Sequence, residues 1–261
     1  MNVTGALRGR VALVTGASRR VGIGAAICRA LTLAGADIAF THWRAYDREL
    51  DYADEDGPDT LLRELRACGG RVVALECDLS DASAPLRLLD TVEAQLGPLS
   101  IVINNAAFST RDGYARLDAA TLDAHYAVNL RATALLSVEF AKRFANGGRG
   151  GRIVNLTSGQ SLGPMPDELA YAASKGAIEA FTLSLSPAVA SQGITVNAVN
   201  PGPTDTGWMT PDLRAQLLQQ FPFGRIGQAD DAARVVAFLV SDEAAWITGQ
   251  IINSEGGFWR R

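Results

Sequence analysis

The chain has 261 residues, 48% of them hydrophobic, and a formal net charge of −4 at pH 7 with a pI near 5.3. This length and composition can build a sizeable α/β core. The acidic balance argues against sequence-independent nucleic-acid binding, which needs a basic face.

The longest apolar runs are broken by charge or glycine well before membrane-spanning length, and the first residues lack a basic-then-apolar signal. We therefore expect a cytoplasmic protein without a membrane segment. The three cysteines, Cys28, Cys68 and Cys77, are scattered in apolar contexts and are predicted to be buried. The two histidines do not cluster with carboxylates, so no metal is expected.

The first strand and turn have the context of a dinucleotide-binding motif. Residues 10–15 form an apolar, β-branched run that is typical of a buried parallel strand. A glycine-rich turn follows at 16–24, and residues 25–31 have helical composition. There, backbone N–H groups and the helix N-terminus can face a pyrophosphate. The alternative is a tight turn without a ligand. The expected contacts in this turn are Gly16, Ser18, Gly22, Ile23 and Gly24.

A second strand is predicted within residues 35–44. In dinucleotide folds an acid at this strand's end, about 20 residues past the glycines, binds the ribose 2′-hydroxyl. The corresponding positions carry His42, Trp43 and Arg44 instead, and Trp43 or Arg44 can cover the adenine face. This favours NADP(H), with NAD(H) still possible; the alternative is that the arginines are solvated surface charges. The candidates for pairing with a 2′-phosphate are Arg19, Arg20 and Arg44.

The next elements continue the alternation of strand and helix. Residues 47–59 are acidic and are predicted to be an exposed insertion. A helix at 60–68 and a strand at 71–77 follow, and the strand ends in Asp78-Leu79. Asp78 can accept a hydrogen bond from an adenine amino group, or it can cap the next helix.

Polar and small residues follow the fourth predicted strand. After a helix at 84–96, the strand at 99–103 ends in Asn104, Asn105, Ala106 and Ala107. Small side chains at a strand end allow a cofactor ring or ribose to approach closely. Residues 117–144 show helical patterns around Asn129. A buried asparagine needs a partner, so Asn129 either satisfies a backbone group or holds a water.

A strand at 152–156 leads to Ser158, and a helix from Tyr171 to about 192 follows, with a kink or break expected at Pro187. Lys175 lies four residues after Tyr171, on the same helix face. An ammonium beside a phenol favours the phenolate and makes the tyrosine a proton donor or acceptor. The only other lysine is Lys142, which indicates that a compact ammonium matters here, although this spacing also arises by chance.

The last third of the chain completes the pattern. A strand at 194–199 precedes the segment 207–225, which has mixed apolar character and is expected to cover the substrate. A helix at 230–239 and a strand at 249–253 follow. The sustained alternation, without linker or repeat, predicts one doubly wound parallel sheet flanked by helices, in a single domain spanning 1–261.

In this order and at these spacings, the motifs resemble the short-chain dehydrogenase/reductase family over nearly the whole chain, and in particular members labelled 3-oxoacyl-carrier-protein reductase-like. The chain departs from the family in its longer glycine loop, in Ala107, and in Ser254-Glu255 before the final glycines. The matching pieces are Thr15-Gly16 with Gly22-Ile23-Gly24, Asp78-Leu79, Asn104 to Ala107, Asn129, Ser158, Tyr171 with Lys175, Pro201-Gly202 with Thr206, and Ile247 to Gln250 with Gly256-Gly257.

The resemblance implies an oxidoreductase that moves hydride between nicotinamide C4 and a carbonyl or secondary alcohol carbon. Tyr171 would act as general acid/base, Lys175 would lower its pKa and bind the nicotinamide ribose, and Ser158 would polarise the substrate oxygen, while Asn129 would hold a water. The implied cofactor contacts also include Asp78 and Leu79 near adenine, Asn105, Ala106 and Ala107 under the ribose, and Thr204 and Thr206 near the carboxamide. Pro201 and Gly202 complete the implied cofactor contacts.

The resemblance also implies a homotetramer, or a homodimer, built on the helices that carry Asn129 and Tyr171. Two other functions remain compatible with the sequence. The same site can serve a sugar, cyclitol or antibiotic-biosynthesis intermediate. A dinucleotide-sensing protein without catalysis is the other, and an intact set of Ser158, Tyr171 and Lys175 argues against it.

Overall fold

A computed structural model describes residues 5–49, 54, 56–144 and 150–260. Seven parallel strands form one sheet in the order β3-β2-β1-β4-β5-β6-β9. The order reverses between β1 and β4, which is where ligands bind in sheets of this kind. The strands are β1 (Val11–Val14), β2 (Asp37–His42), β3 (Val72–Glu76), β4 (Ile101–Asn104), β5 (Arg152–Leu156), β6 (Thr195–Asn200) and β9 (Ile251–Asn253).

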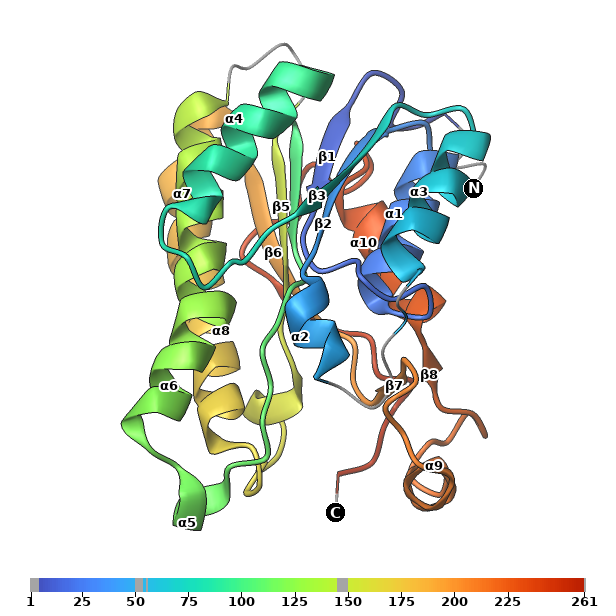
Figure 1. Cartoon of the computed structure of the whole chain (residues 1–261), viewed down its shortest axis with the longest axis vertical. Helices are drawn as coiled ribbons and strands as arrows, with labels where there is room; N and C mark the ends of the chain where they lie inside the picture. The colour runs from blue at the N-terminus through green and yellow to red at the C-terminus, as the bar shows by residue number, and fades with distance from the viewer. Residues whose placement is uncertain (1–4, 50–53, 55, 145–149, 261) are drawn as a thin grey trace.

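Helices cover both faces of the sheet, which confirms the predicted doubly wound fold (Figure 1). One face is covered by α1 (Ile23–Leu33), α3 (Gly57–Ala67) and α10 (Ala229–Leu239). The other is covered by α4 (Ala84–Leu96), α7 (Thr133–Arg143) and α8 (Leu169–Val189). Among the described residues, none of the helices has the length and apolarity needed to cross a membrane.

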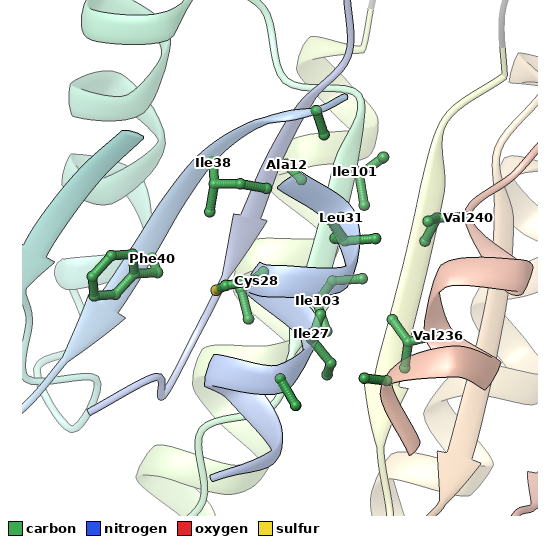
Figure 2. Packing of buried hydrophobic residues seen from close by; sticks show 14 of the residues in the cluster. Ala12, Ile27, Cys28, Leu31, Ile38, Phe40, Ile101, Ile103, Val236 and Val240 are labelled. Carbon is green, nitrogen blue, oxygen red and sulfur yellow. The ribbon is translucent and has the colours of Figure 1, made fainter. Parts of the chain in front are cut away.

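Helix α1 forms the centre of one hydrophobic layer. Its Ile27, Cys28 and Leu31 are fully buried and lie among strand residues such as Ile38 and Ile101, with Val236 and Val240 at the α10 side (Figure 2). Because both faces of the sheet are covered, the central strands are buried and largely apolar, and this is why the sequence identified them correctly.

Two buried arginines tie together the chain segments at the amino ends of the strands. Arg10 donates from Nη2 to the carbonyls of Gly150 (2.6 Å) and Ser100 (3.1 Å), and Arg152 donates to the carbonyl of Ser241 (3.3 Å). Each guanidinium also lies 3.8 Å from the Asp242 carboxylate. These donors bond to loop carbonyls from three separate chain segments, which lie together at this end of the sheet.

The region predicted as helical at 117–144 contains three pieces. It consists of α6 (Ala119–His125), a π-helical turn η1 (Tyr126–Ala132) and α7. Asn129 lies in the middle of the π-helical turn, and such turns are frequent at functional sites because they reorient side chains. Pro187 lies in the last turn of α8, which ends at Val189 and continues as the 3₁₀ turn η3 (Ala190–Gln192). The break expected at Pro187 therefore occurs just after it.

Several short elements were not predicted. These are α2 (Arg44–Arg48), α5 (Gly113–Arg116) and the parallel pair β7 (Thr204–Asp205) and β8 (Gly227–Gln228). The segment 207–225 contains the helix α9 (Pro211–Leu218). Figure 1 places α2, α5, α9 and the β7/β8 pair beyond the carboxyl ends of the strands. Residues 50–53 and 55 of the predicted acidic insertion lie outside the described residues.

The cysteine prediction was wrong at one position. Cys28 is buried and Cys77 is partly buried, but Cys68 is exposed because it ends α3 at the protein surface. Among the described residues, no group of three or more His, Cys, Asp and Glu side chains comes together in a way that could hold a metal.

Candidate active site

A cleft of about 540 Å³ opens at the carboxyl ends of the strands, around the switch point between β1 and β4. Most of the residues predicted for cofactor binding line this cleft. They are Gly16, Ser18, Arg19, Gly22, Ile23, Gly24, Trp43, Asp78, Leu79, Asn105, Ala106, Ala107, Tyr171, Lys175, Pro201 and Thr206. The predicted residues that are not part of its lining are Arg20, Arg44, Asn129, Ser158, Gly202 and Thr204.

The glycine loop and the start of α1 form one wall of the cleft. Gly16 has a φ of +73°, and a Cβ added there would lie 2.6 Å from Ala106 Cα, so only glycine fits. Gly22 precedes α1, whose first turn has neither a side-chain cap nor an acidic residue. The first turn of α1 therefore brings no carboxylate of its own to the cleft, which suits the pyrophosphate of a dinucleotide.

Asn105 joins the end of β4 to the glycine loop. Its Nδ2 donates to the carbonyls of Thr15 (2.9 Å) and Gly16 (2.8 Å). Thr15 Oγ1 in turn accepts from the backbone N–H groups of Asn105 and Ala106, both at 3.0 Å. These bonds fix the floor of the cleft, where the sequence predicted close approach of a ribose.

The three arginines predicted to pair with a 2′-phosphate differ in their surroundings. Arg19 lines the cleft and donates from Nη1 to the Thr206 carbonyl at 2.7 Å. Arg20 is paired with Asp54 at 3.0 Å. Arg44 is paired with Asp59 at 2.7 Å and is not part of the cleft lining. Of the three, Arg19 alone borders the cleft itself.

The residues at the end of β2 form another part of the cleft wall. His42 is 6% exposed, and its Nδ1 is buried without a hydrogen-bond partner in the described part of the chain. Burial, together with the nearby Arg44 charge, lowers the pKa of His42, so the ring is neutral at pH 7. Trp43 is more exposed and its backbone N–H donates to Ser18 Oγ at 3.3 Å.

An aromatic group that sequence reasoning missed contributes an apolar wall. Tyr46 from α2 and Phe108, just beyond β4, both line the cleft, and their ring centroids are 5.5 Å apart. Phe108 also contacts the His125 ring edge-on at 4.9 Å. Both follow positions that the sequence singled out, but the pairing depends on how α2 folds back over the cleft. No local pattern signals it.

Tyr171 and Lys175 lie on consecutive turns at the start of α8, and both line the cleft. Lys175 is 2% exposed, its Nζ donates to the Leu156 carbonyl at 2.7 Å, and this nitrogen lies 5.5 Å from the Tyr171 ring centroid. Burial lowers the pKa of Lys175 to about 8. The i and i+4 geometry predicted from sequence is therefore present.

The pKa of Tyr171 shifts in the opposite direction to the one predicted from its lysine neighbour. Burial, with a further contribution from Glu168, raises the pKa of Tyr171 to about 12. A side-chain hydrogen bond with Ser158 acts the other way and lowers that pKa. The free-energy cost of removing the phenolate from water exceeds the stabilisation that the surrounding groups give to its charge. At neutral pH Tyr171 is thus a phenol.

Ser158 follows β5 in an extended conformation and begins the short 3₁₀ turn η2 (Gly159–Ser161). Although it is not part of the cleft lining, it bonds to the Tyr171 side chain. The return of the chain from β5 to α8 therefore brings the serine and the tyrosine together, as the family resemblance implied.

Asn129 satisfies a backbone segment, which is the first of the two predicted alternatives. Its Oδ1 accepts from Phe108 N–H (2.7 Å), and its Nδ2 donates to the Phe108 carbonyl (2.9 Å) and to Ser174 Oγ (2.9 Å). Ser174 Oγ donates to the Tyr171 carbonyl at 2.8 Å. The π-helical turn is thereby joined to both the cleft wall and the start of α8.

Comparisons with known proteins agree with this arrangement. A family model described as Enoyl-(Acyl carrier protein) reductase matches residues 16–259. A protein of Bacillus subtilis named as an uncharacterized oxidoreductase, YjdA, is 55% identical over 252 residues, which cover 96% of this chain and 97% of that protein.

Solved structures show the same fold. A short-chain dehydrogenase/reductase from Serratia marcescens superimposes with a TM-score of 0.86 at 34% identity, covering 98% of this chain and 100% of that one. The angucycline C-6 ketoreductase LanV with bound NADP superimposes with a TM-score of 0.86 at 33% identity, covering 97% of each chain.

Proposed function

The chain belongs to the short-chain dehydrogenase/reductase family of oxidoreductases, and from this premise we propose that it is an NADP(H)-dependent carbonyl reductase in which Tyr171 handles the proton of the substrate oxygen. The single observation that carries this proposal is the meeting of Tyr171 and Lys175 on one face of α8, in the same cleft as the glycine loop. A protein that only senses a dinucleotide has no need for this pair.

Tyr171 supplies a proton to the substrate oxygen in this account. The raised pKa of about 12 keeps the phenol protonated at neutral pH, which favours proton donation and hence reduction of a carbonyl over oxidation of an alcohol. The Ser158 hydroxyl bonds to the tyrosine side chain and is in position to hold the same oxygen. The reverse reaction, oxidation of an alcohol, requires the phenolate, so its rate should increase as pH rises.

In this proposal Lys175 binds and positions its neighbours, and it does not exchange a proton with the substrate. Its ammonium is buried, bound to the Leu156 carbonyl and close to the Tyr171 ring. We propose that its remaining donors bind the nicotinamide ribose. Asn129 acts at a distance from the substrate, because its side chain fixes Phe108 and, through Ser174, the first turn of α8.

The cleft suits a nicotinamide dinucleotide. The uncapped start of α1 and the close approach that Gly16 allows form a cradle for a pyrophosphate. Asp78 and Leu79 would border the adenine, with Asn105, Ala106 and Ala107 along the ribose side, and Pro201, Gly202, Thr204 and Thr206 near the carboxamide. When bound, such a cofactor supplies or accepts the hydride.

We propose NADP(H) over NAD(H) because no acid ends β2. Its last residue, His42, is neutral, and the next residue along the cleft is Trp43. Ser18 and Arg19 border the cleft on the glycine loop. To bind a 2′-phosphate, the Arg19 guanidinium would exchange its bond to the Thr206 carbonyl for one to the phosphate. The NADP bound in the ketoreductase LanV is in line with this preference.

Three large or branched side chains can form an apolar surface for a substrate. Tyr46, Phe108 and Val128 line the cleft, which favours an apolar or aromatic carbonyl compound. The segment 207–225 would cover the substrate: Trp208 is fixed by a bond from Nε1 to the Thr204 carbonyl at 2.9 Å, and Phe221 is buried while Phe223 is 77% exposed. In this account residues 1–261 act as one cofactor-binding and catalytic domain.

A homo-oligomer, with four copies as the leading state, also belongs to the proposal. The outer faces of α7 and α8 carry the exposed apolar residues Leu135 and Leu183, which a second copy would cover. Light scattering of the purified protein measures this directly, and a monomer at micromolar concentration would remove this part of the proposal.

The reaction itself is tested by mixing the protein with NADPH or NADH and a panel of aromatic, aliphatic and acyl-thioester ketones, and following cofactor oxidation. We expect oxidation of NADPH with at least one aromatic or aliphatic ketone, faster than with NADH. Tight binding of NADPH without turnover on any carbonyl would instead support a sensing protein.

A further inference from the structure

We propose that Glu255 and Arg260 form a clamp that holds the turn following Ser158, and thereby positions Ser158 against Tyr171. This inference rests on the proposed function, in which Ser158 and Tyr171 share the substrate oxygen. We call the pair of side chains the Glu255–Arg260 clamp. Both lie beyond β9, in the part of the chain that ends near the carboxyl edge of the sheet (Figure 1).

The clamp is a bidentate ion pair in a sheltered place. Arg260 Nη1 lies 2.8 Å from Glu255 Oε2, and Nη2 bonds to Oε1 of the same carboxylate. The Glu255 side chain is only 8% exposed and that of Arg260 21%. Asn200, at the end of β6, donates from Nδ2 to Glu255 Oε1 at 2.8 Å. The carboxylate is therefore fixed to the central sheet, and the pair is weakly screened by solvent.

The guanidinium of Arg260 packs directly on the turn after Ser158. A Cβ added to Gly159 would overlap the guanidinium group, and one added to Gly163 would lie 2.7 Å from Arg260 Cδ. Neither glycine has a positive φ, so their backbone conformations do not require glycine. The two missing side chains make room for Arg260 along the whole turn.

The other side of this turn is held by α8. Ser161 Oγ donates to Glu179 Oε1 at 3.3 Å, and Thr157 Oγ1 donates to the same oxygen at 3.2 Å. Within the turn, the amides of Leu162 and Gly163 both donate to the Gly159 carbonyl, at 3.0 and 3.2 Å. The turn is thus held between Glu179 on one side and Arg260 on the other, with Ser158 at its start.

The same chain segment also contacts the proposed substrate cover. Arg260 lies over the Phe258 ring, 5.2 Å from its centroid, and Phe258 packs against Phe221 with centroids 4.9 Å apart. Trp259 N–H donates to the Gln220 carbonyl at 2.9 Å. One short segment therefore touches both the Ser158 turn and the 207–225 segment. A shift of this segment would move Ser158, and a misplacement of about 1 Å at a catalytic group can lower the rate by up to about 100-fold.

Two variants release the clamp in different ways. Arg260→Met keeps most of the stem and removes the guanidinium, and Gly159→Ala introduces a methyl group where the guanidinium lies. The control is Arg234→Met. The Arg234 side chain is 68% exposed and forms an ion pair with Asp231 at the protein surface. In each protein we would measure amide hydrogen exchange at Leu162 and Gly163, the NADPH dissociation constant, and kcat with a ketone that the wild type reduces.

The clamp predicts faster exchange at both amides in Arg260→Met and Gly159→Ala, a fall in kcat of about tenfold or more, and an NADPH dissociation constant within about twofold of wild type. The double variant should lose little more than either single one, because both remove the same contact. Arg234→Met should resemble wild type in all three measurements.

Unchanged exchange in Arg260→Met would overturn the clamp, and faster exchange with an unchanged kcat would overturn its positioning role. Strictly multiplicative losses in the double variant would also contradict a shared contact. If the wild type binds NADPH but reduces no carbonyl, the proposed function fails. The exchange measurements would then still decide whether Arg260 holds the turn.

Discussion

The ammonium of Lys175 lies 5.5 Å from the centre of the Tyr171 ring and donates to the Leu156 carbonyl. Lys175 is buried and Tyr171 is partly buried, and their pKa values shift in opposite directions, to about 8 for Lys175 and about 12 for Tyr171. At neutral pH the site therefore holds a protonated phenol beside an ammonium, which suits proton donation to a carbonyl.

The lysine shift should be visible in the pH dependence of folding. The pKa of Lys175 falls from 10.5 to about 8 on folding, so between these values the unfolded chain binds more protons. Stability due to this group must therefore rise with pH across that window. The free energy of unfolding of wild type, minus that of Lys175→Met, should grow by about 2 kcal/mol from pH 7 to pH 9.5 in urea titrations.

A difference between the two proteins that stays constant over this range would show that Lys175 keeps its ordinary pKa.

Tyr171 affects the free energy of unfolding at higher pH than Lys175 does, and with the opposite sign. Its folded pKa of about 12 exceeds the usual 10.0, so its contribution is complete below pH 10 and is lost as pH rises through 12. The two windows barely overlap, and the measurement at pH 9.5 avoids the tyrosine.

The choice of cofactor should depend on Arg19 far more than on Arg44. Arg19 lines the cleft, whereas Arg44 is paired with Asp59 away from it. We expect Arg19→Gln to weaken NADPH binding by about tenfold or more and NADH binding little, because the loss of a charge-assisted bond to phosphate costs about 1.5–3 kcal/mol. Arg44→Gln is the matched control. Fluorescence titration gives the four dissociation constants, and an equal loss of both cofactors in Arg19→Gln would contradict a role at the 2′-phosphate.

The buried arginine at the amino end of β1 should be needed for stability. Arg10 donates to the carbonyls of Ser100, Gly150 and Val240, and Arg10→Met leaves these acceptors without that donor. We expect a loss of about 2–4 kcal/mol in the free energy of unfolding. The exposed Arg234→Met should change it by about 0.5 kcal/mol or less. Equal effects of the two substitutions in urea unfolding would contradict this role for Arg10.

The sequence predicted the sheet well because its strands are buried on both faces. Short, largely apolar runs with β-branched residues, such as 10–15 and 152–156, are typical of strands buried on both faces, and β1 and β5 are found there. The glycine loop and the Tyr171–Lys175 spacing were recognisable because each depends on local geometry. In the structure both motifs line the same cleft.

Other features depend on contacts between distant segments and left no local signal. The π-helical turn around Asn129 mixes apolar and polar residues much as the flanking α-helices do, so its sequence does not mark it as different. The aromatic wall needs Tyr46 to meet Phe108 across the cleft. Arg20 and Arg44, two of the arginines expected at the phosphate, form ion pairs with Asp54 and Asp59. The sequence alone does not show which carboxylate pairs with each arginine.

The direct test of the central claim is Tyr171→Phe, which removes one oxygen atom and keeps the ring. Single-turnover reduction of a ketone by NADPH should slow by about 10²–10⁴-fold, while the NADPH dissociation constant stays within about threefold and the melting temperature is not lowered. Turnover by Tyr171→Phe at a rate close to that of the wild type would contradict the assignment of Tyr171 as the proton donor.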